Sequence, residues 1–153
     1  MDSLFHGTPI TADDQALIDT AKSLIEQRYL EGRHHIASAV RGTSGKVYTG
    51  LHLDTYVGRA SVCAEAVALG QAMASGEKGV QAIVSVRHPR PREQHQDCKV
   101  VSPCGICRQS LQEFEERLRS PIKLVLGGMK GKIIVIEKAS QLLPLAFTSE
   151  ELK

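Results

Sequence analysis

Residues 103–109 read PCGICRQ and residues 63–65 read CAE, and these two stretches decide both the fold and the chemistry. Cys104 and Cys107 are three residues apart at the expected start of a helix, so both sulfurs can point to one side of its first turn. Cys63 opens another expected helix. Helix N-termini carry partial positive charge and free N–H groups, which lower thiol pKa values and solvate thiolates. Two such helix ends facing each other predict three thiolates around one Zn²⁺.

The same residues predict a catalytic rather than a structural metal. Three protein ligands leave the fourth tetrahedral position of zinc open to water. Glu65 lies two residues after Cys63, too close along the backbone to need to be a ligand, and is placed to handle the proton of that water. Three thiolates outweigh the charge of one dication, which weakens the metal as a Lewis acid. Helix N-termini and Arg108, or alternatively Arg59, are the expected sources of compensating positive charge.

The first half of the chain alternates between helical and extended patterns. Thr11 and Asp14 form a near capping box, and the apolar spacing that follows predicts an amphipathic helix over residues 12–30. Residues 36–40 and 46–53 read as two strands. The Gly-Thr-Ser-Gly sequence between them supplies turn residues, so the pair is expected to form a hairpin.

The second half continues the alternation. Ser102 is expected to cap a third helix, with Pro103 at its first position and its end before Pro121. The remaining predicted elements are a helix over 63–75, a buried strand over 82–86, a polar proline-containing loop over 88–97, strands over 122–126 and 132–136, and a short helical segment over 140–143.

The order of these elements predicts an α/β protein with a mixed sheet and helices on its faces. The chain has 153 residues and shows no internal repeat, linker or low-complexity tract. A chain of this length can bury a substantial core, so residues 1–153 are expected to form a single domain.

The amino-acid composition argues against nucleic acids and membranes as binding partners. Apolar residues make up 42% and charged residues 24%, as in an ordinary soluble protein. Lysine and arginine number 19 against 17 aspartates and glutamates, so no strong field for nucleic acid or membrane is expected. No apolar run is long enough to span a bilayer, and the N-terminus lacks a secretory pattern. A cytoplasmic location follows by default, where cysteines suit metal binding or catalysis better than disulfides.

The two motifs resemble those of the cytidine deaminase superfamily. The likeness extends to IASAV at 36–40, YTGLHL at 48–53 and LLP at 142–144, and is greatest to the blasticidin S deaminases and the small nucleoside cytidine deaminases. It implies a three-layer α/β/α sandwich with a mixed five-stranded sheet, assembled as a homotetramer. It also implies that Glu65 is the general acid/base and that the zinc ligands are Cys63, Cys104 and Cys107.

The resemblance implies hydrolysis of the C–N bond of a free cytosine nucleoside, which converts cytidine or deoxycytidine to its uridine counterpart plus ammonia. His52 and Asp54 stand where nucleoside cytidine deaminases carry N-x-E to hold the ribose. His34 and His35 stand where an aromatic residue is expected, and Phe147 matches a C-terminal aromatic of blasticidin S deaminases. The expected substrate contacts are His35, His52, Asp54, Ala64, Pro103 and Phe147.

Several alternatives remain open at this stage. The substrate can instead be a modified cytosine nucleoside such as blasticidin S, or the protein can be a binder that lost turnover, although a pure binder has no use for Glu65. Cys98 could complete a structural Cys₄ zinc site, and the C-x-x-C pair could be a redox motif. The histidines at strand ends could be satisfied polar residues. The basic residues of the 88–97 loop read as a solvated surface rather than a nucleic-acid patch.

Overall fold

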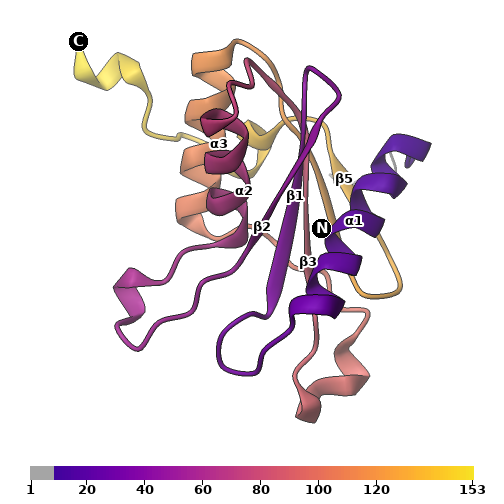
Figure 1. Cartoon of the computed structure of the whole chain (residues 1–153). Coiled ribbons are helices and arrows are strands. Elements are labelled where there is room, and N and C mark those ends of the chain that lie inside the picture. Colours follow the sequence, from indigo (N-terminus) through magenta and orange to yellow (C-terminus); the bar gives the residue numbers. More distant parts are fainter. Residues whose placement is uncertain (1–8) are drawn as a thin grey trace.

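The computed structural model describes residues 9–153, and its centre is a five-stranded sheet in the order β2-β1-β3-β4-β5 (Figure 1). The strands are β1 (Ile36–Gly42), β2 (Val47–Leu51), β3 (Val80–Arg87), β4 (Lys123–Gly128) and β5 (Ile134–Ile136). Strand β1 runs antiparallel to both β2 and β3, β3 runs parallel to β4, and β4 runs antiparallel to β5. The predicted mixed sheet is therefore confirmed.

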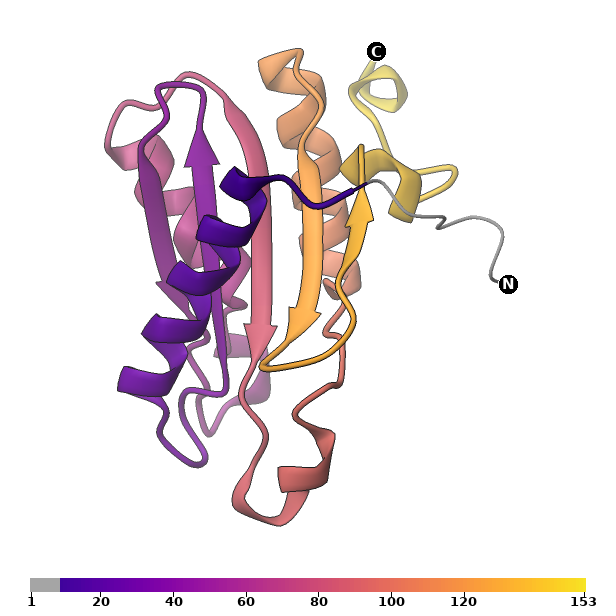
Figure 2. The ribbon, with the colours of Figure 1, turned by 90° about the vertical axis from the view of Figure 1, so that its right-hand side faces the viewer.

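Three helices cover the two faces of this sheet. Helix α1 (Ala12–Arg28) lies alone on one face, whereas α2 (Ala64–Ala74) and α3 (Gly105–Leu118) lie together on the other (Figures 1 and 2). The capping box predicted at Thr11 and Asp14 is present at the start of α1. The predicted three-layer α/β/α arrangement is confirmed.

Strand alternation divides the core between the two faces. Under α1, Ala37 of β1 and Val84 of β3 pack against buried residues of the helix. On the opposite face, Val40 and Ile83 pack against residues of α2 and α3. Each strand therefore contributes alternate side chains to two separate apolar layers, as expected for a sheet that is covered on both faces.

Helix α2 approaches β2 closely at Gly50. A Cβ atom added there would lie 2.5 Å from the carbonyl oxygen of Ala64 and 2.5 Å from the backbone nitrogen of Ala68. Because both atoms belong to the helix backbone, no side-chain movement could relieve the clash. The absence of a side chain at Gly50 thus sets how closely the first turn of α2 rests on the sheet.

The start of the third helix differs from the prediction. The residue that caps α3 is Cys104, which has an extended backbone and whose carbonyl accepts the N–H of Arg108 at 2.9 Å. Ser102 and Pro103 lie outside the helix, so the prediction of Ser102 as the cap was wrong. A serine followed by a proline commonly marks the start of a helix, but here Cys104 occupies the N-cap position of α3.

The hairpin strands also differ in length from the prediction. Strand β1 runs to Gly42, beyond the predicted 36–40, and β2 ends at Leu51, short of the predicted 46–53. The chain turns away after Leu51, and Leu53 instead forms an isolated antiparallel bridge with Val62. This bridge closes the loop that leads into α2.

The loop predicted over 88–97 contains a 3₁₀ helix, Pro91–Gln96. Glu93 accepts hydrogen bonds from the Arg87 guanidinium and from the backbone N–H of Arg90 at 3.4 Å, which ties the loop to the end of β3. The short helical segment predicted over 140–143 is a 3₁₀ helix at Ala139–Leu142. Two further 3₁₀ helices, Gly58–Ala60 and Ser149–Leu152, had no counterpart in the prediction.

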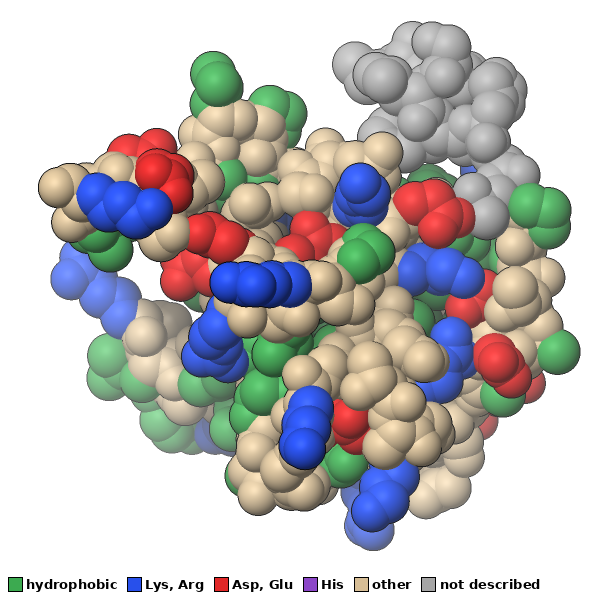
Figure 3. Space-filling view, turned by 90° about the horizontal axis from the view of Figure 1, so that it is seen from above, with side chains coloured by type: hydrophobic (Ala, Val, Ile, Leu, Met, Phe, Trp, Pro, Cys, Tyr) green, Lys and Arg blue, Asp and Glu red, His purple; other side chains and the backbone are tan. Residues whose placement is uncertain are grey.

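The surface mixes charges of both signs. At the upper end of the molecule, acidic and basic side chains are interspersed (Figure 3). Within residues 9–153, none of the helices has the length and apolar character needed to cross a membrane. The predicted single domain begins at residue 1, and residues 1–8 lie outside the described residues.

Candidate active site

Sheet topology brings the two sequence motifs together. Strands β2 and β3 run in the same direction, because each is antiparallel to β1. The loops that follow them therefore leave the sheet at the same end, and α2 and α3 both begin there (lower end in Figure 1). Cys63 occupies the N-cap of α2 and Cys104 the N-cap of α3, with Cys107 in the first turn of α3.

The three thiols of Cys63, Cys104 and Cys107 lie within 4.8 Å of one another. The Sγ atoms of Cys63 and Cys104 are 3.5 Å apart, and those of Cys104 and Cys107 are 3.7 Å apart. Two thiolates bound at ~2.3 Å to a tetrahedral zinc ion have sulfurs ~3.8 Å apart. The spacing of these sulfurs therefore fits one zinc ion.

The pKa values of the three thiols indicate that the cluster needs a positive charge to ionise fully. Burial raises the pKa of Cys63 to about 11, and burial together with the charge of Glu65 raises the pKa of Cys107. Burial acts in the same direction on Cys104, but hydrogen bonds from the backbone N–H groups of Cys107 and Ile106, together with those shared with the neighbouring thiols, lower its pKa overall. A bound cation is what would hold all three as thiolates at neutral pH.

Glu65 lies in the first turn of α2 and is buried, with 6% of its surface exposed. Within residues 9–153 its carboxylate makes no hydrogen bond to another side chain or to the backbone. It lines a cavity of about 90 Å³ together with two of the thiols. The other residues that line this cavity are Ser61, Val62, Ala66, Leu69, Ile106 and Ser110. The carboxylate is therefore free to act on a small molecule that enters beside the thiols.

Cys98 stands apart from the cluster. Its exposed thiol donates to the Oδ1 atom of Asp97 at 3.2 Å, in the loop that follows β3. Among the described residues, the group that can hold a metal contains three cysteines and not Cys98. The geometry does not support a four-cysteine structural site.

Arg108 bonds to backbone rather than to sulfur. Its Nε donates to the carbonyl of Pro103 at 2.9 Å, and its Nη1 donates to the carbonyl of Leu142 at 3.2 Å. In residues 9–153 it makes no hydrogen bond to a cysteine thiol. The role of Arg108 in charge balance stays a prediction. The alternative, Arg59, lies exposed in the 3₁₀ helix Gly58–Ala60.

Four of the predicted substrate contacts lie at the same end of the sheet as the cysteines. His52 follows the last residue of β2, and its Nδ1 atom is buried without a hydrogen-bond partner in the described structure. Asp54 accepts a hydrogen bond from the Ser61 hydroxyl at 3.2 Å. Ala64 and Pro103 are buried neighbours of Cys63 and Cys104.

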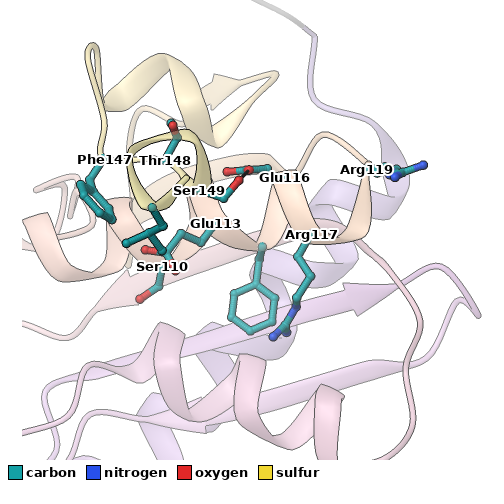
Figure 4. A pocket seen from close by; sticks show the side chains of 10 residues that line it. Ser110, Glu113, Glu116, Arg117, Arg119, Phe147, Thr148 and Ser149 are labelled. Carbon is teal, nitrogen blue, oxygen red and sulfur yellow. Dashed lines mark hydrogen bonds between the residues drawn. The ribbon is translucent and has the colours of Figure 1, made fainter.

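His35 lies at this end as well, and Phe147 does not. The buried ring of His35 lies between Tyr29, the C-cap of α1, and His52, with ring centroids 5.6 Å and 6.4 Å apart, and within the described residues neither of its ring nitrogens has a hydrogen-bond partner. The ring of Phe147 is half-exposed and lines a separate groove between α3 and the C-terminal residues (Figure 4). None of the six predicted substrate contacts lines the cavity beside Glu65.

Comparison with known proteins places these residues in a family. The sequence model of the cytidine and deoxycytidylate deaminase zinc-binding region matches residues 11–119, a span that contains all three clustered cysteines and Glu65. The chain belongs to this deaminase family. The deaminase is therefore an enzyme that hydrolyses a C–N bond, and its cofactor is zinc.

Individual relatives cover nearly the whole deaminase chain. Blasticidin-S deaminase of Bacillus cereus is 36% identical over 139 residues, which are 91% of this chain and 95% of that protein. Cytidine deaminase of Halalkalibacterium halodurans is 32% identical over 141 residues, 92% of this chain and 98% of that protein. The crystal structure of cytidine deaminase from Burkholderia pseudomallei aligns with a TM-score of 0.71 and 30% identity, over 87% of this chain and 98% of that one.

Two contacts near the predicted site of the deaminase did not follow from the sequence. His34 and His35 both lie beside His52, but it is the Nδ1 atom of His34 that contacts the carbonyl oxygen of His52, at 2.8 Å. Gln109 donates to the carbonyl of Phe147 at 2.8 Å. It lies inside the PCGICRQ motif, but nothing in the sequence names its partner.

Proposed function

We propose that this deaminase hydrolyses a free cytosine nucleoside, with Cys63, Cys104 and Cys107 as the zinc ligands and Glu65 as the general acid/base. The observation that carries the proposal is the position of Glu65. Glu65 is buried and lines a cavity together with two of the three thiols, and its carboxylate makes no hydrogen bond within the described residues.

The roles of the residues follow from the chemistry. When bound, zinc supplies a Lewis acid that makes water nucleophilic near neutral pH. Glu65 accepts a proton as water oxygen bonds to C4 of the ring, and transfers it to ring nitrogen N3. Glu65 then moves the second proton of the water to the exocyclic amine, which leaves as ammonia when the C4–N bond breaks. Backbone groups near Ala64 and Pro103 hold the ring while this happens.

The residues at the end of β2 bear on the choice of substrate. His52, whose buried Nδ1 has no partner within the described residues, and Asp54 stand where an asparagine and a glutamate are expected to hold a ribose. An unpaired buried polar group costs about 1–3 kcal/mol, so a site shaped for another sugar binds ribose less well. A second candidate follows from this: a modified cytosine nucleoside such as blasticidin S, which the likeness to the Bacillus cereus enzyme also favours.

A substrate panel tests this choice. We expect ammonia release from cytidine that is measurable but weak, and faster release from a cytosine compound with an altered sugar. The double variant His52→Asn with Asp54→Glu should raise kcat/KM for cytidine relative to that compound, because it restores the ribose-binding pair. The measurement is kcat/KM across cytidine, deoxycytidine, blasticidin S, adenosine and guanosine.

The controls separate the substrate from the reaction class. Deamination of adenosine or guanosine in place of cytosine compounds would contradict the proposed reaction. Efficient cytidine deamination by the natural protein, made worse by the double variant, would show that His52 and Asp54 already hold ribose. That result would remove the altered-sugar candidate and leave cytidine as the substrate.

We also propose that the enzyme is a homotetramer that works in the cytoplasm. The cavity beside Glu65 has a volume of about 90 Å³, whereas small-molecule sites usually begin at ~300 Å³. Residues of neighbouring chains would therefore complete the walls of the substrate site. Exposed apolar side chains are available for such contacts, among them Tyr56, Ile106 and Leu145. Closely spaced free thiols also favour a reducing compartment.

Light scattering of the zinc-loaded protein tests the assembly. We expect a mass of four chains, since closed symmetric assembly would cover the exposed apolar side chains and enclose the nucleoside. Dilution to lower concentration should reduce activity and mass together. A monomer with full activity would contradict the proposal.

A further inference from the structure

The two residues that directly follow Cys107 both reach the C-terminal part of the chain. Arg108 Nη1 donates to the carbonyl of Leu142 at 3.2 Å, and Gln109 Nε2 donates to the carbonyl of Phe147 at 2.8 Å. These acceptors are 34 and 38 residues further along the chain than their donors. The last two residues of the PCGICRQ motif thus make two hydrogen bonds to residues 142–147.

Each donor is also anchored at its other side. Arg108 Nε donates to the carbonyl of Pro103, the residue before Cys104. One guanidinium therefore links the backbone that precedes the cysteines to Leu142. The Nε2 group of Gln109 also donates to Glu113, one turn further along α3, at 2.7 Å. Both amide hydrogens of Gln109 are therefore used, and its orientation is fixed.

Up to Leu142 the chain is also held by the core and by Glu115 of α3, which accepts hydrogen bonds from the N–H groups of Ala139 and Ser140, but beyond Leu142 little else holds it against α3. A groove of about 530 Å³ runs between α3 and this part of the chain, and Figure 4 shows Ser110 and Glu113 on one side and Phe147 and Thr148 on the other. Leu145 is fully exposed and 53% of Phe147 is exposed. A hydrogen bond between Ser149 and Glu116 adds one further contact. A segment with so little buried apolar surface is held mainly by its polar contacts.

We propose that Arg108 and Gln109 are positioning residues that transmit the state of the metal site to residues 142–149. The inference rests on the proposed ligand set. A metal ion bound by Cys104 and Cys107 fixes the first turn of α3, and with it the side chains of Arg108 and Gln109. Without the metal, a helix start with unpaired N–H groups frays easily, and the two side chains lose the fixed base from which they hold Leu142 and Phe147.

A tryptophan in place of Phe147 would report on this coupling. The chain contains no tryptophan, so Phe147→Trp gives a single fluorophore in the groove. With zinc bound, acrylamide should quench it as expected for a half-covered side chain. Removal of zinc with a chelator should raise the quenching constant roughly twofold, because the exposed fraction would rise from 53% towards that of a free side chain.

Two variants in the Phe147→Trp background complete the experiment. Adding Gln109→Leu should give high quenching with zinc still bound and little further change on chelation. Gln112→Leu is the matched control, since this residue lies on the same helix and makes no side-chain hydrogen bond within residues 9–153. It should behave like the Phe147→Trp parent. The metal content of each sample is measured alongside.

The outcomes separate the coupling from the proposed function. Loss of zinc and of activity without any change in tryptophan quenching would overturn the coupling and leave the proposed function standing. An equal response of the Gln109→Leu and Gln112→Leu proteins would also overturn it. A natural protein that binds no zinc through these cysteines would overturn both.

Discussion

Replacement of Glu65 by glutamine is expected to lower kcat by about 10²–10⁴-fold while zinc stays bound. The amide has nearly the size of the carboxylate, so the buried position beside the cysteines is kept. It cannot accept and return a proton, so transfer from water to N3 and to the leaving amine fails. Burial, and after it the charge of Glu65, raises the pKa of Cys107, and Glu65 is outside the three-thiol cluster, so its replacement should leave the metal bound.

The measurement is kcat together with zinc content. Glu26→Gln is a suitable control, because Glu26 is an exposed residue of α1 on the opposite face of the sheet, and this variant should keep full activity. Near-normal turnover by a zinc-replete Glu65→Gln protein would remove Glu65 from the mechanism.

Replacement of Cys107 by serine is expected to give the second large effect. Cys107 is the buried member of the three-thiol cluster, and a serine hydroxyl does not ionise to replace the thiolate. We expect zinc affinity to fall by at least about 100-fold and activity to fall with it. Elemental analysis after dialysis against a weak chelator would measure the loss.

Cys98→Ser is the matched control for this change. Cys98 is exposed and lies outside the cluster, so about one zinc per chain and full activity should remain. Loss of zinc from the Cys98→Ser protein would instead support a structural zinc site made of four cysteines, which the geometry does not favour.

The order of helices and strands and the two cysteine motifs could be predicted because each is a local pattern, whereas the five-stranded sheet and the full ligand set followed from the resemblance to the deaminase superfamily. Helix and strand periodicity identified the main elements, and the cysteine spacing indicated one metal site. The cap of α3 was misplaced because Ser102 and Pro103 form a start signal that Cys104 overrides. Local pattern alone could not reveal this outcome, because serine is a preferred N-cap residue and cysteine is not, and the Cys104 side chain makes no capping hydrogen bond.

The substrate end of the site was harder to predict for a different reason. His34 and His35 are adjacent in sequence and both meet His52 after β2, but His34 contacts its carbonyl oxygen whereas the ring of His35 lies between the rings of Tyr29 and His52. The partner of Gln109 lies 38 residues away, beyond the reach of any local rule. Contacts of this kind depend on how distant segments pack, which a single sequence does not contain.

The metal cluster also has a consequence for the unfolded chain. Cys63 and Cys104 are 41 residues apart, and the stretch between them includes all of α2 and β3. A covalent link that closes a loop of this length removes enough chain entropy to stabilise a fold by about 4 kcal/mol. On the proposed ligand set, zinc acts as a reversible link of the same kind. The free energy of unfolding then rises with the logarithm of the free zinc concentration, which makes the lifetime of the folded chain a function of metal supply.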